Sequence, residues 1–369
     1  MRKSFPVLIR LVLSCSNVLS LSAPFPVIPQ RFLGRSAPSL QHLSLRCISF
    51  PRLPTFLLSA RNIVTLELEA IPPNGYISPE VMARSLSALT KLTTLSISFF
   101  DDYFPEDQRR SHPDPPIRAI FPALVAFEYG GCNEYLEDFL ARIDTPRLNQ
   151  LGLYYFMREI EALQLSRFIQ RTEHLSTAQF ARAEVTFYNV DVSFNLDCPR
   201  GNSSQALLAL NVNDPPFLEE QVRSMVAIVP DGALFSCVDH LYAHGDFVDT
   251  TEISASDWLP FFRLFPAVRT LRLYGGVESS FFAALEDTTE DMIPDVFPAL
   301  HLIWLVKCED KAKTVYHDPV GSIDHFLSLR QLAGRPVTIV YTKDEFDEAE
   351  TNLLGHLKRP VGDGLVGVL

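Results

Sequence analysis

The sequence predicts an α/β solenoid, and three observations lead to that fold class. A short apolar motif recurs along the 369 residues, with successive copies near the C-terminal end 31, 30 and 32 residues apart. Stretches with helical periodicity lie between the copies of the motif. Phe-Pro dipeptides stand directly before several of these copies. A repeating unit of strand, loop and helix builds a curved solenoid, with parallel strands on the concave side and helices on the convex side.

The motif is clearest between Phe297 and Cys308, which contains Leu300-x-x-Ile303-x-Leu305-x-x-Cys308. This pattern is the strand half of a leucine-rich repeat with cysteine at its last position. Alternate side chains of a strand share a face, so Ile303 and Leu305 are expected to point into the core and Trp304 outward. The same LxxLxL frame begins at Leu8, Leu40, Ile63, Leu92, Leu124, Leu148, Leu207, Val238, Val268 and Leu300.

Helices are expected between these strands. Phe-Pro before a strand ends the preceding helix, because proline disfavours a helical conformation at the residue before it. Helical periodicity occurs at residues 80–89, 133–143, 159–171, 256–264, 280–285 and 322–332. Expected helix starts are Ser78-Pro79, Asn133, Ser256 and Ser322, and Gly334 is an expected helix stop.

One solenoid domain is expected over residues 1–342, with about ten to twelve irregular repeats. A charged, Pro-rich loop at residues 101–118 interrupts it. A β-rich part at residues 175–204 fits no LxxLxL frame and predicts an irregular repeat or a small hairpin. Residues 343–369 form an acidic and then Gly-rich tail, which is expected to be loosely ordered.

The N-terminus has two interpretations. Basic residues 1–3 followed by the apolar stretch 5–23 are typical of a secretory signal peptide cleaved near Ala23. However, residues 5–13 have the same FPxLxxLxL form as the strand that starts at Phe297, so a repeat strand and an intracellular protein are favoured over secretion. A solenoid that starts with an uncapped strand exposes apolar surface, so residues 1–369 expressed alone are expected to aggregate.

Composition excludes several function classes. The net charge is −12 and there is no basic block, which makes nucleic acid an unsuitable partner. Outside the N-terminal stretch, no uninterrupted apolar run reaches the roughly 18 residues of a membrane span. The six cysteines are scattered singly, without metal-ligand spacing, and are expected to be free thiols, with Cys132 and Cys308 turned inward. The GxGxxG pattern at residues 362–367 lacks the strand and helix that dinucleotide binding needs, and no cofactor is expected.

The most site-like cluster is Asp239 to Asp246, in which His240, Tyr242 and His244 alternate on one face of an expected strand. One hypothesis is a zinc site formed by His240, His244 and Asp246. The favoured alternative is an ordinary polar face that contacts a protein. Tyrosine, tryptophan and arginine are the residue types of binding hot spots, and no nucleophile–base signature points to an enzyme. The expected partner-binding residues on the concave face are His240, Tyr242, His244, Arg272, Tyr274 and Trp304.

Residues 5–340 resemble the leucine-rich-repeat half of fungal F-box-like proteins. The resemblance rests on the FPxL strand starts and on the segments Phe32–Leu40, Gly75–Glu80, Leu86–Thr90 and Tyr135–Leu148. It implies a ubiquitin-ligase adaptor, in which an N-terminal F-box recruits the ligase core and the repeats hold the substrate. Residues 1–4 leave no room for an F-box. A ligase-core partner is therefore expected only if an F-box lies upstream of Met1.

Overall fold

The chain forms two compact units in the computed structural model. Unit 1 comprises Met1–Ala178 and Arg200–Asp214, and unit 2 comprises Gln179–Pro199 and Pro215–Leu369. The structure describes residues 5–15, 25–30, 32–35, 37–100, 117–155, 163–188, 191–197, 207–213, 222–223, 226, 233–245, 255–275, 277–287, 289, 296–306, 323–342 and 365–366. The predictions for most of the loop at 101–118, for Ser322 and Cys308, and for most of the tail lie outside these residues.

Unit 1 contains a sheet in which all neighbouring strands are parallel. In order of pairing, these are β1 (Arg10–Ser14), β2 (His42–Arg46), β3 (Thr65–Ile71), β4 (Thr94–Phe99), β6 (Ala126–Gly131), β8 (Gln150–Tyr155) and β11 (Leu207–Asn213). Its helices are α1 (Leu53–Leu57), α2 (Pro79–Leu86), α3 (Asn133–Ala141), α4 (Leu163–Arg171) and α5 (Glu173–Ser176), with 3₁₀ turns η1 (Phe32–Arg35) and η2 (Pro73–Gly75). A separate parallel pair joins β5 (Ala119–Ile120) to β7 (Ile143–Asp144).

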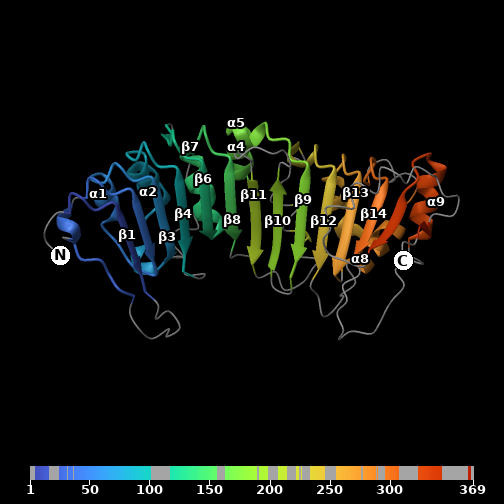
Figure 1. The fold of residues 1–369 in the computed structure, drawn as a ribbon, viewed down its shortest axis with the longest axis horizontal. Coiled ribbons are helices and arrows are strands. Elements are labelled where there is room, and N and C mark those ends of the chain that lie inside the picture. The colour runs from blue at the N-terminus through green and yellow to red at the C-terminus, as the bar shows by residue number, and fades with distance from the viewer. Residues whose placement is uncertain are drawn as a thin grey trace. The chain divides into compact units, whose positions relative to one another are not determined.

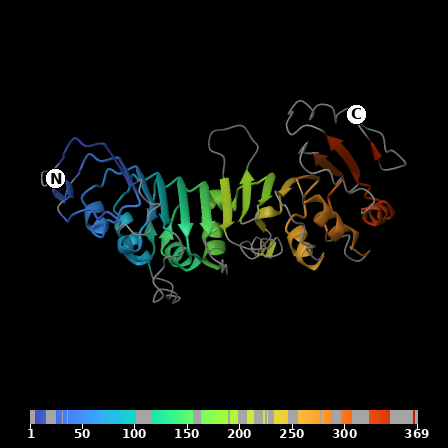
Figure 2. The same cartoon turned by 90° about the horizontal axis from the view of Figure 1, so that it is seen from below.

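Unit 2 starts with an antiparallel hairpin of β9 (Arg182–Phe187) and β10 (Asp191–Asp197). Parallel strands then continue from β9 in the order β12 (His240–Gly245), β13 (Thr270–Gly275), β14 (Leu302–Val306), β15 (Thr338–Thr342) and β16 (Leu365–Val366). The helices are α7 (Ala255–Arg263), α8 (Glu278–Glu286) and α9 (Asp324–Leu332), with the 3₁₀ turn η4 (Ala233–Phe235). Figure 1 shows the strands of each unit side by side. Figure 2 shows that the helices of each unit lie on one side of its strands.

The predicted frame explains why these strands pair. Ile303 and Leu305 are buried and lie in register with Leu271 and Leu273 of the preceding strand, β13. The two inward positions of the frame recur in register from strand to strand, so the repeats stack their apolar side chains into one core within each unit. The fold is an irregular leucine-rich-repeat solenoid, as the sequence predicts.

The N-terminal strand is confirmed for Arg10–Ser14, which pairs in parallel with β2. It has one described neighbour, and Val12 is 52% exposed on its outward side. An edge strand of this kind presents unpaired backbone groups and apolar side chains to solvent. The prediction of aggregation therefore stays open to test.

Two assignments in the irregular region are wrong. The hairpin is confirmed, but β9 does follow the frame, because Ala183 and Val185 lie in register with Leu241 and Ala243 of β12. The frame there starts at the buried Phe180. The strand β11 pairs Leu208 with Leu151 and Leu210 with Leu153, so its frame lies two residues earlier than predicted.

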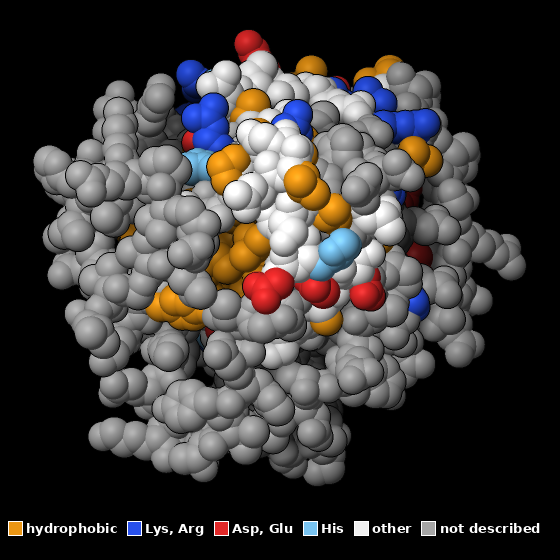
Figure 3. All heavy atoms as spheres, turned by 90° about the vertical axis from the view of Figure 1, so that its right-hand side faces the viewer, with side chains coloured by type: hydrophobic (Ala, Val, Ile, Leu, Met, Phe, Trp, Pro, Cys, Tyr) orange, Lys and Arg blue, Asp and Glu red, His pale blue; other side chains and the backbone are white. Residues whose placement is uncertain are grey.

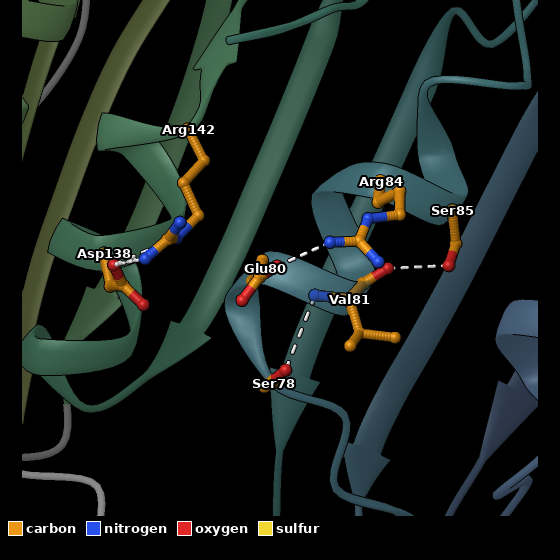
Figure 4. A network of polar contacts seen from close by, with 7 residues as sticks. All are labelled: Ser78, Glu80, Val81, Arg84, Ser85, Asp138 and Arg142. Carbon is orange, nitrogen blue, oxygen red and sulfur yellow. Dashed lines mark hydrogen bonds and ion pairs between the residues drawn. The ribbon is translucent and has the colours of Figure 1, made fainter. Parts of the chain in front are cut away.

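Helix ends agree with the sequence at some positions and differ at others. Ser78 caps α2, because its hydroxyl accepts a hydrogen bond from the Val81 N–H at 3.4 Å, with Pro79 as the first helical residue (Figure 4). Gly334 follows α9 with φ +69°, which confirms the predicted stop. Asn133 is instead the first residue of α3, whose cap position is Cys132, and Ser256 lies inside α7.

Short side-chain bonds hold the helices of unit 1. In α2, the Arg84 guanidinium is 2.5 Å from Glu80 Oε1, and the Ser85 hydroxyl donates to the Val81 carbonyl. In α3, the Arg142 guanidinium donates twice to Asp138 Oδ1 just after the last turn. Both ion pairs join residues four apart, the spacing at which helical neighbours face each other (Figure 4).

Two carboxylates connect consecutive helices. Glu137 of α3 accepts hydrogen bonds from the backbone N–H groups of Gln164 and Leu165, at 2.6 and 2.9 Å, at the start of α4. Glu286 of α8 does the same for His325 at the start of α9, at 3.1 Å. The first N–H groups of a helix have no partner inside the helix, and its positive end favours a carboxylate. Each acid therefore caps the helix of the following repeat.

Replacing Glu286 with alanine is expected to lower the free energy of unfolding by about 1 kcal/mol, the usual cost of losing a helix N-cap. Chemical denaturation followed by circular dichroism measures this loss. Glu286→Gln is the matched control, because it keeps an acceptor oxygen without the charge and is expected to lose less. An alanine variant as stable as the native protein would contradict the capping role.

Candidate protein-binding face

The outward side chains of unit 2 form a polar and aromatic surface. Inward residues of β12 and β13 are buried, whereas the residues between them are partly exposed. We call this surface the outward face, and it is formed by Arg182, Glu184, Thr186, His240, Tyr242, His244, Thr270, Arg272, Tyr274, Leu302 and Trp304. All six residues predicted to bind a partner lie on it, and all six are partly exposed.

Four of these side chains form a row across the strands, which we call the central row. Glu184, Tyr242, Arg272 and Trp304 lie opposite one another in register on β9, β12, β13 and β14. Neighbouring strands are about 4.8 Å apart, so the row is roughly 14 Å long. The Arg272 guanidinium carbon lies 6.0 Å from the centre of the Tyr242 ring, within the range of a cation–π contact.

A stacked pair borders the central row on one side. The rings of His244 and Tyr274 are 4.2 Å apart and nearly parallel, with 11° between their planes. Gly275 follows Tyr274 with φ +82°, and a Cβ atom there would lie 2.7 Å from His244 Cδ2 and 2.2 Å from the Gly245 carbonyl oxygen. Glycine is therefore needed at this position for the imidazole to approach the backbone.

On the other side of the row, His240 Nδ1 lies 2.7 Å from Asp239 Oδ1. The zinc hypothesis for this cluster is wrong on geometry. His240 and His244 are four residues apart on the extended strand β12, which separates their backbones by about 13 Å. Two side chains at that distance cannot both reach one zinc ion at bonds of about 2 Å. Within the described part of the chain, no group of three or more potential ligands surrounds a common point, and Asp246 lies outside it.

Trp304 marks the end of the aromatic surface. It points outward as predicted, and β15 places Val340 beside it in register. Leu302 and Val340 also occupy outward positions but are only 8% and 7% exposed. β15 thus adjoins Trp304 without burying it.

Glu184 is the member of the central row that the sequence pattern did not predict. Its strand frame, Phe180-x-x-Ala183-x-Val185, has no leucine and therefore does not match the LxxLxL pattern. The sequence signal for this strand is the spacing of Phe180, Ala183 and Val185. In register with β12, Ala183 and Val185 take the two inward positions, which leaves Glu184 outward between them.

A packed aromatic cluster supports the outward face from beneath. Trp258 and Phe261 of α7 contact Phe187 at the end of β9, and Trp258 lies 4.3 Å from Phe281 of α8, measured between ring centres. These rings are completely buried. A well-packed core holds its surface strands in one geometry, which is the usual basis of a preformed binding site.

Arg330 fixes the turn that leads into β14. Its side chain is 1% exposed, and its guanidinium donates to the Leu300 carbonyl at 2.5 Å. Burial lowers the pKa of Arg330, and the charge of nearby Arg335 lowers it further. The contact ties α9 to the turn before β14, and thus stabilises the strand that carries Trp304.

The outward positions of unit 1 differ in character. Glu67 and Glu128 lie two strands apart in one row, and Arg46 is 3.7 Å from Glu69 in the next. Among the outward strand positions that the structure describes in this unit, Tyr154 is the one Phe, Tyr or Trp side chain. Aromatic residues are therefore concentrated on the face of unit 2, where Tyr242, Tyr274 and Trp304 lie.

No described helix is long and apolar enough to cross a lipid bilayer. No protein-family model matches the sequence, and no curated protein matches it. The solved structures to which the chain is similar include the following two. The leucine-rich repeat-containing protein LegL7 from Legionella pneumophila is 13% identical, with a TM-score of 0.32, over 89% of this chain and 91% of that one. An internalin, InlF, from Listeria monocytogenes is 8% identical, with a TM-score of 0.28, over 92% of this chain and 82% of that one.

Proposed function

We propose that the chain is a non-enzymatic scaffold that binds a protein partner through the outward face of unit 2. The observation that carries the proposal is the central row, which combines an acid, a tyrosine, an arginine and a tryptophan in adjacent register. Tyrosine, tryptophan and arginine supply most of the binding energy of protein interfaces. A rigid sheet presents them without the entropic cost of ordering a loop.

The chemistry of this face favours a protein over other ligands. Acidic and basic side chains alternate with aromatic ones along the central row, which suits the mixed surface of a protein better than a phosphate polymer. Figure 3 views the molecule from the side where α9 lies, and there most of the described Lys and Arg side chains lie towards the top and most Asp and Glu side chains below the centre. A pocket lined by Leu45, Leu68 and Met82, among other apolar residues, belongs to unit 1 and is not part of this face.

The resemblance to fungal F-box-like proteins extends the proposal to an intracellular ubiquitin-ligase adaptor, whose repeats hold a substrate. The genomic sequence upstream of Met1 tests this extension: an in-frame F-box there, together with capture of the ligase-core adaptor by the extended chain, would support it. The alternative is a secreted leucine-rich-repeat binding protein with residues 1–23 as its signal peptide. N-terminal sequencing of the protein from its own cells decides between the two, because cleavage near Ala23 would overturn the intracellular proposal.

The binding face is tested by site-specific photocrosslinking in the cells that express the protein. A photoreactive residue at Tyr274 is expected to capture a protein, whereas one at Tyr154, an exposed tyrosine on unit 1, is not. Trp304→Ala and Arg272→Ala are then expected to weaken that partner by 30-fold or more, which corresponds to about 2 kcal/mol for a hot-spot residue. Tyr154→Ala is the matched control. Unchanged affinity in the first two variants would contradict the proposal.

A further inference from the structure

The ends of β1 and β2 bring two cysteines side by side. Their parallel register places Ser14 opposite Arg46, so Cys15 and Cys47 are the next residues of the two strands. The ladder continues at this point, because the Cys15 N–H donates to the Arg46 carbonyl at 3.1 Å. Neighbouring strands lie about 4.8 Å apart, which is within the roughly 4.4–6.8 Å that separates the Cα atoms of disulfide-bonded cysteines.

The surroundings of the two thiols differ. Cys15 is partly exposed, whereas Cys47 is 3% exposed. Cys47 has φ +55°, a left-handed conformation that turns its side chain away from the regular strand direction. Burial raises the pKa of Cys47, the Arg46 charge lowers it, and a thiolate at Cys15 raises it again.

We propose that Cys15 and Cys47 are an oxidation site that forms an intramolecular disulfide between β1 and β2, with oxidised glutathione as the co-reactant. The partly exposed Cys15 thiolate attacks glutathione disulfide, forms a mixed disulfide and releases one glutathione thiolate. The Cys47 thiol then loses its proton and attacks the Cys15 sulfur, which releases the second glutathione. Two protein thiols are oxidised, and one glutathione disulfide is reduced to two thiols.

The bond acts on the edge strand of unit 1. β1 has one described neighbour and exposes Val12, so its opening uncovers apolar side chains and unpaired backbone. A disulfide to β2 closes the intervening loop and restricts this opening. The oxidation state of the pair therefore controls how firmly the first repeat is attached, without involving the outward face of unit 2.

The test equilibrates the full chain in glutathione buffers of increasing oxidation, followed by acid quenching, alkylation of free thiols and peptide mass spectrometry. A peptide pair that joins Cys15 to Cys47, lighter by two hydrogens, is expected in oxidising buffers and absent in reducing ones. Cys47→Ser is expected to trap glutathione on Cys15, because the second attack is lost. Cys15→Ser is expected to leave the buried Cys47 unmodified, and Cys237→Ser, which changes an exposed cysteine, is the matched control.

Hydrogen exchange measured on the same samples gives a readout without any substitution. Oxidation is expected to slow exchange of the amides of β1 at least tenfold in the native protein and to leave β1 unchanged in Cys15→Ser. A native protein that carries glutathione on Cys15 while Cys47 stays free would overturn the proposal. Disulfides that join Cys15 equally to Cys47 and Cys237 would also overturn it, since such scrambling shows that the strands do not hold the pair together.

Discussion

Replacing Trp258 with alanine is expected to lower the free energy of unfolding by about 4 kcal/mol, the usual cost of deleting a large buried aromatic side chain. Trp258 is completely buried in α7 and is the largest side chain of the aromatic cluster. Its ring lies 5.6 Å from Phe187, 5.7 Å from Phe262 and 4.3 Å from Phe281 between ring centres. Alanine removes all of these contacts and leaves a cavity that packed neighbours fill only in part.

Trp304→Ala is the matched control, because it removes the same side chain from a partly exposed position. It is expected to cost less than about 1 kcal/mol of stability while lowering partner affinity. Urea denaturation followed by far-ultraviolet circular dichroism measures both variants. The two substitutions therefore separate support of the outward face from contact with the partner. Equal loss of stability in both variants would contradict the assignment of Trp258 to the core and Trp304 to the surface.

Repeat packing also predicts where the Trp258→Ala effect is felt. In a solenoid, each repeat contacts its sequence neighbours, so destabilisation stays local. Hydrogen exchange is expected to accelerate in β12 and β13, which overlie the aromatic cluster, and to change little in β3 and β4 of unit 1. Uniform acceleration in both units would show instead that the chain unfolds as one cooperative block.

The LxxLxL frame was sufficient to predict most strands because the buried positions are three and two residues apart and are occupied by large aliphatic side chains. It failed where that signal became ambiguous. Around β11, Leu207, Leu210 and Val212 match the whole frame, whereas Leu208 and Leu210 match only its last two positions. Pairing of Leu208 with Leu151 and of Leu210 with Leu153 of β8 selects the second alternative. In β9, alanine and valine fill the inward positions, so the strand lacks the leucines by which the frame is identified.

The candidate site was predictable in part for the same physical reason. Alternation along a strand identifies which side chains point outward, so the sequence was enough to place Tyr242, Arg272 and Trp304 on one face. It does not reveal which residues of different strands are neighbours, because register is set by packing between repeats. The alignment of Glu184 with Tyr242, and the adjacency of Cys15 and Cys47, come from register alone.

Glu278→Gln is expected to stabilise the protein at neutral and alkaline pH. Glu278 is the first residue of α8, three residues beyond Gly275 at the end of β13. Burial raises the pKa of its carboxyl from 4.5 to about 7, and a hydrogen bond from its own backbone N–H only partly opposes this. The folded protein therefore holds a proton that the unfolded chain releases at lower pH.

The sign of the effect follows from proton binding. Between pH 4.5 and about 7 the folded state binds more protons at Glu278 than the unfolded state does, so the contribution of this group to stability falls as the pH rises. Above pH 7 the cost is fully present, with a ceiling of about 3 kcal/mol at roughly 1.4 kcal/mol per pKa unit. Glutamine has no charge to bury, so the variant avoids this cost.

Denaturation midpoints of the native protein and Glu278→Gln, compared from pH 4.5 to pH 8, measure this difference. The two are expected to be nearly equal at pH 4.5, with the variant more stable by a growing margin up to pH 8. Glu80→Gln, which removes an exposed carboxylate in the first turn of α2, is the matched control. A stability difference between Glu278→Gln and the native protein that is constant with pH would mean that the Glu278 carboxyl has the same pKa in the folded and unfolded states. Burial would then not hold it neutral.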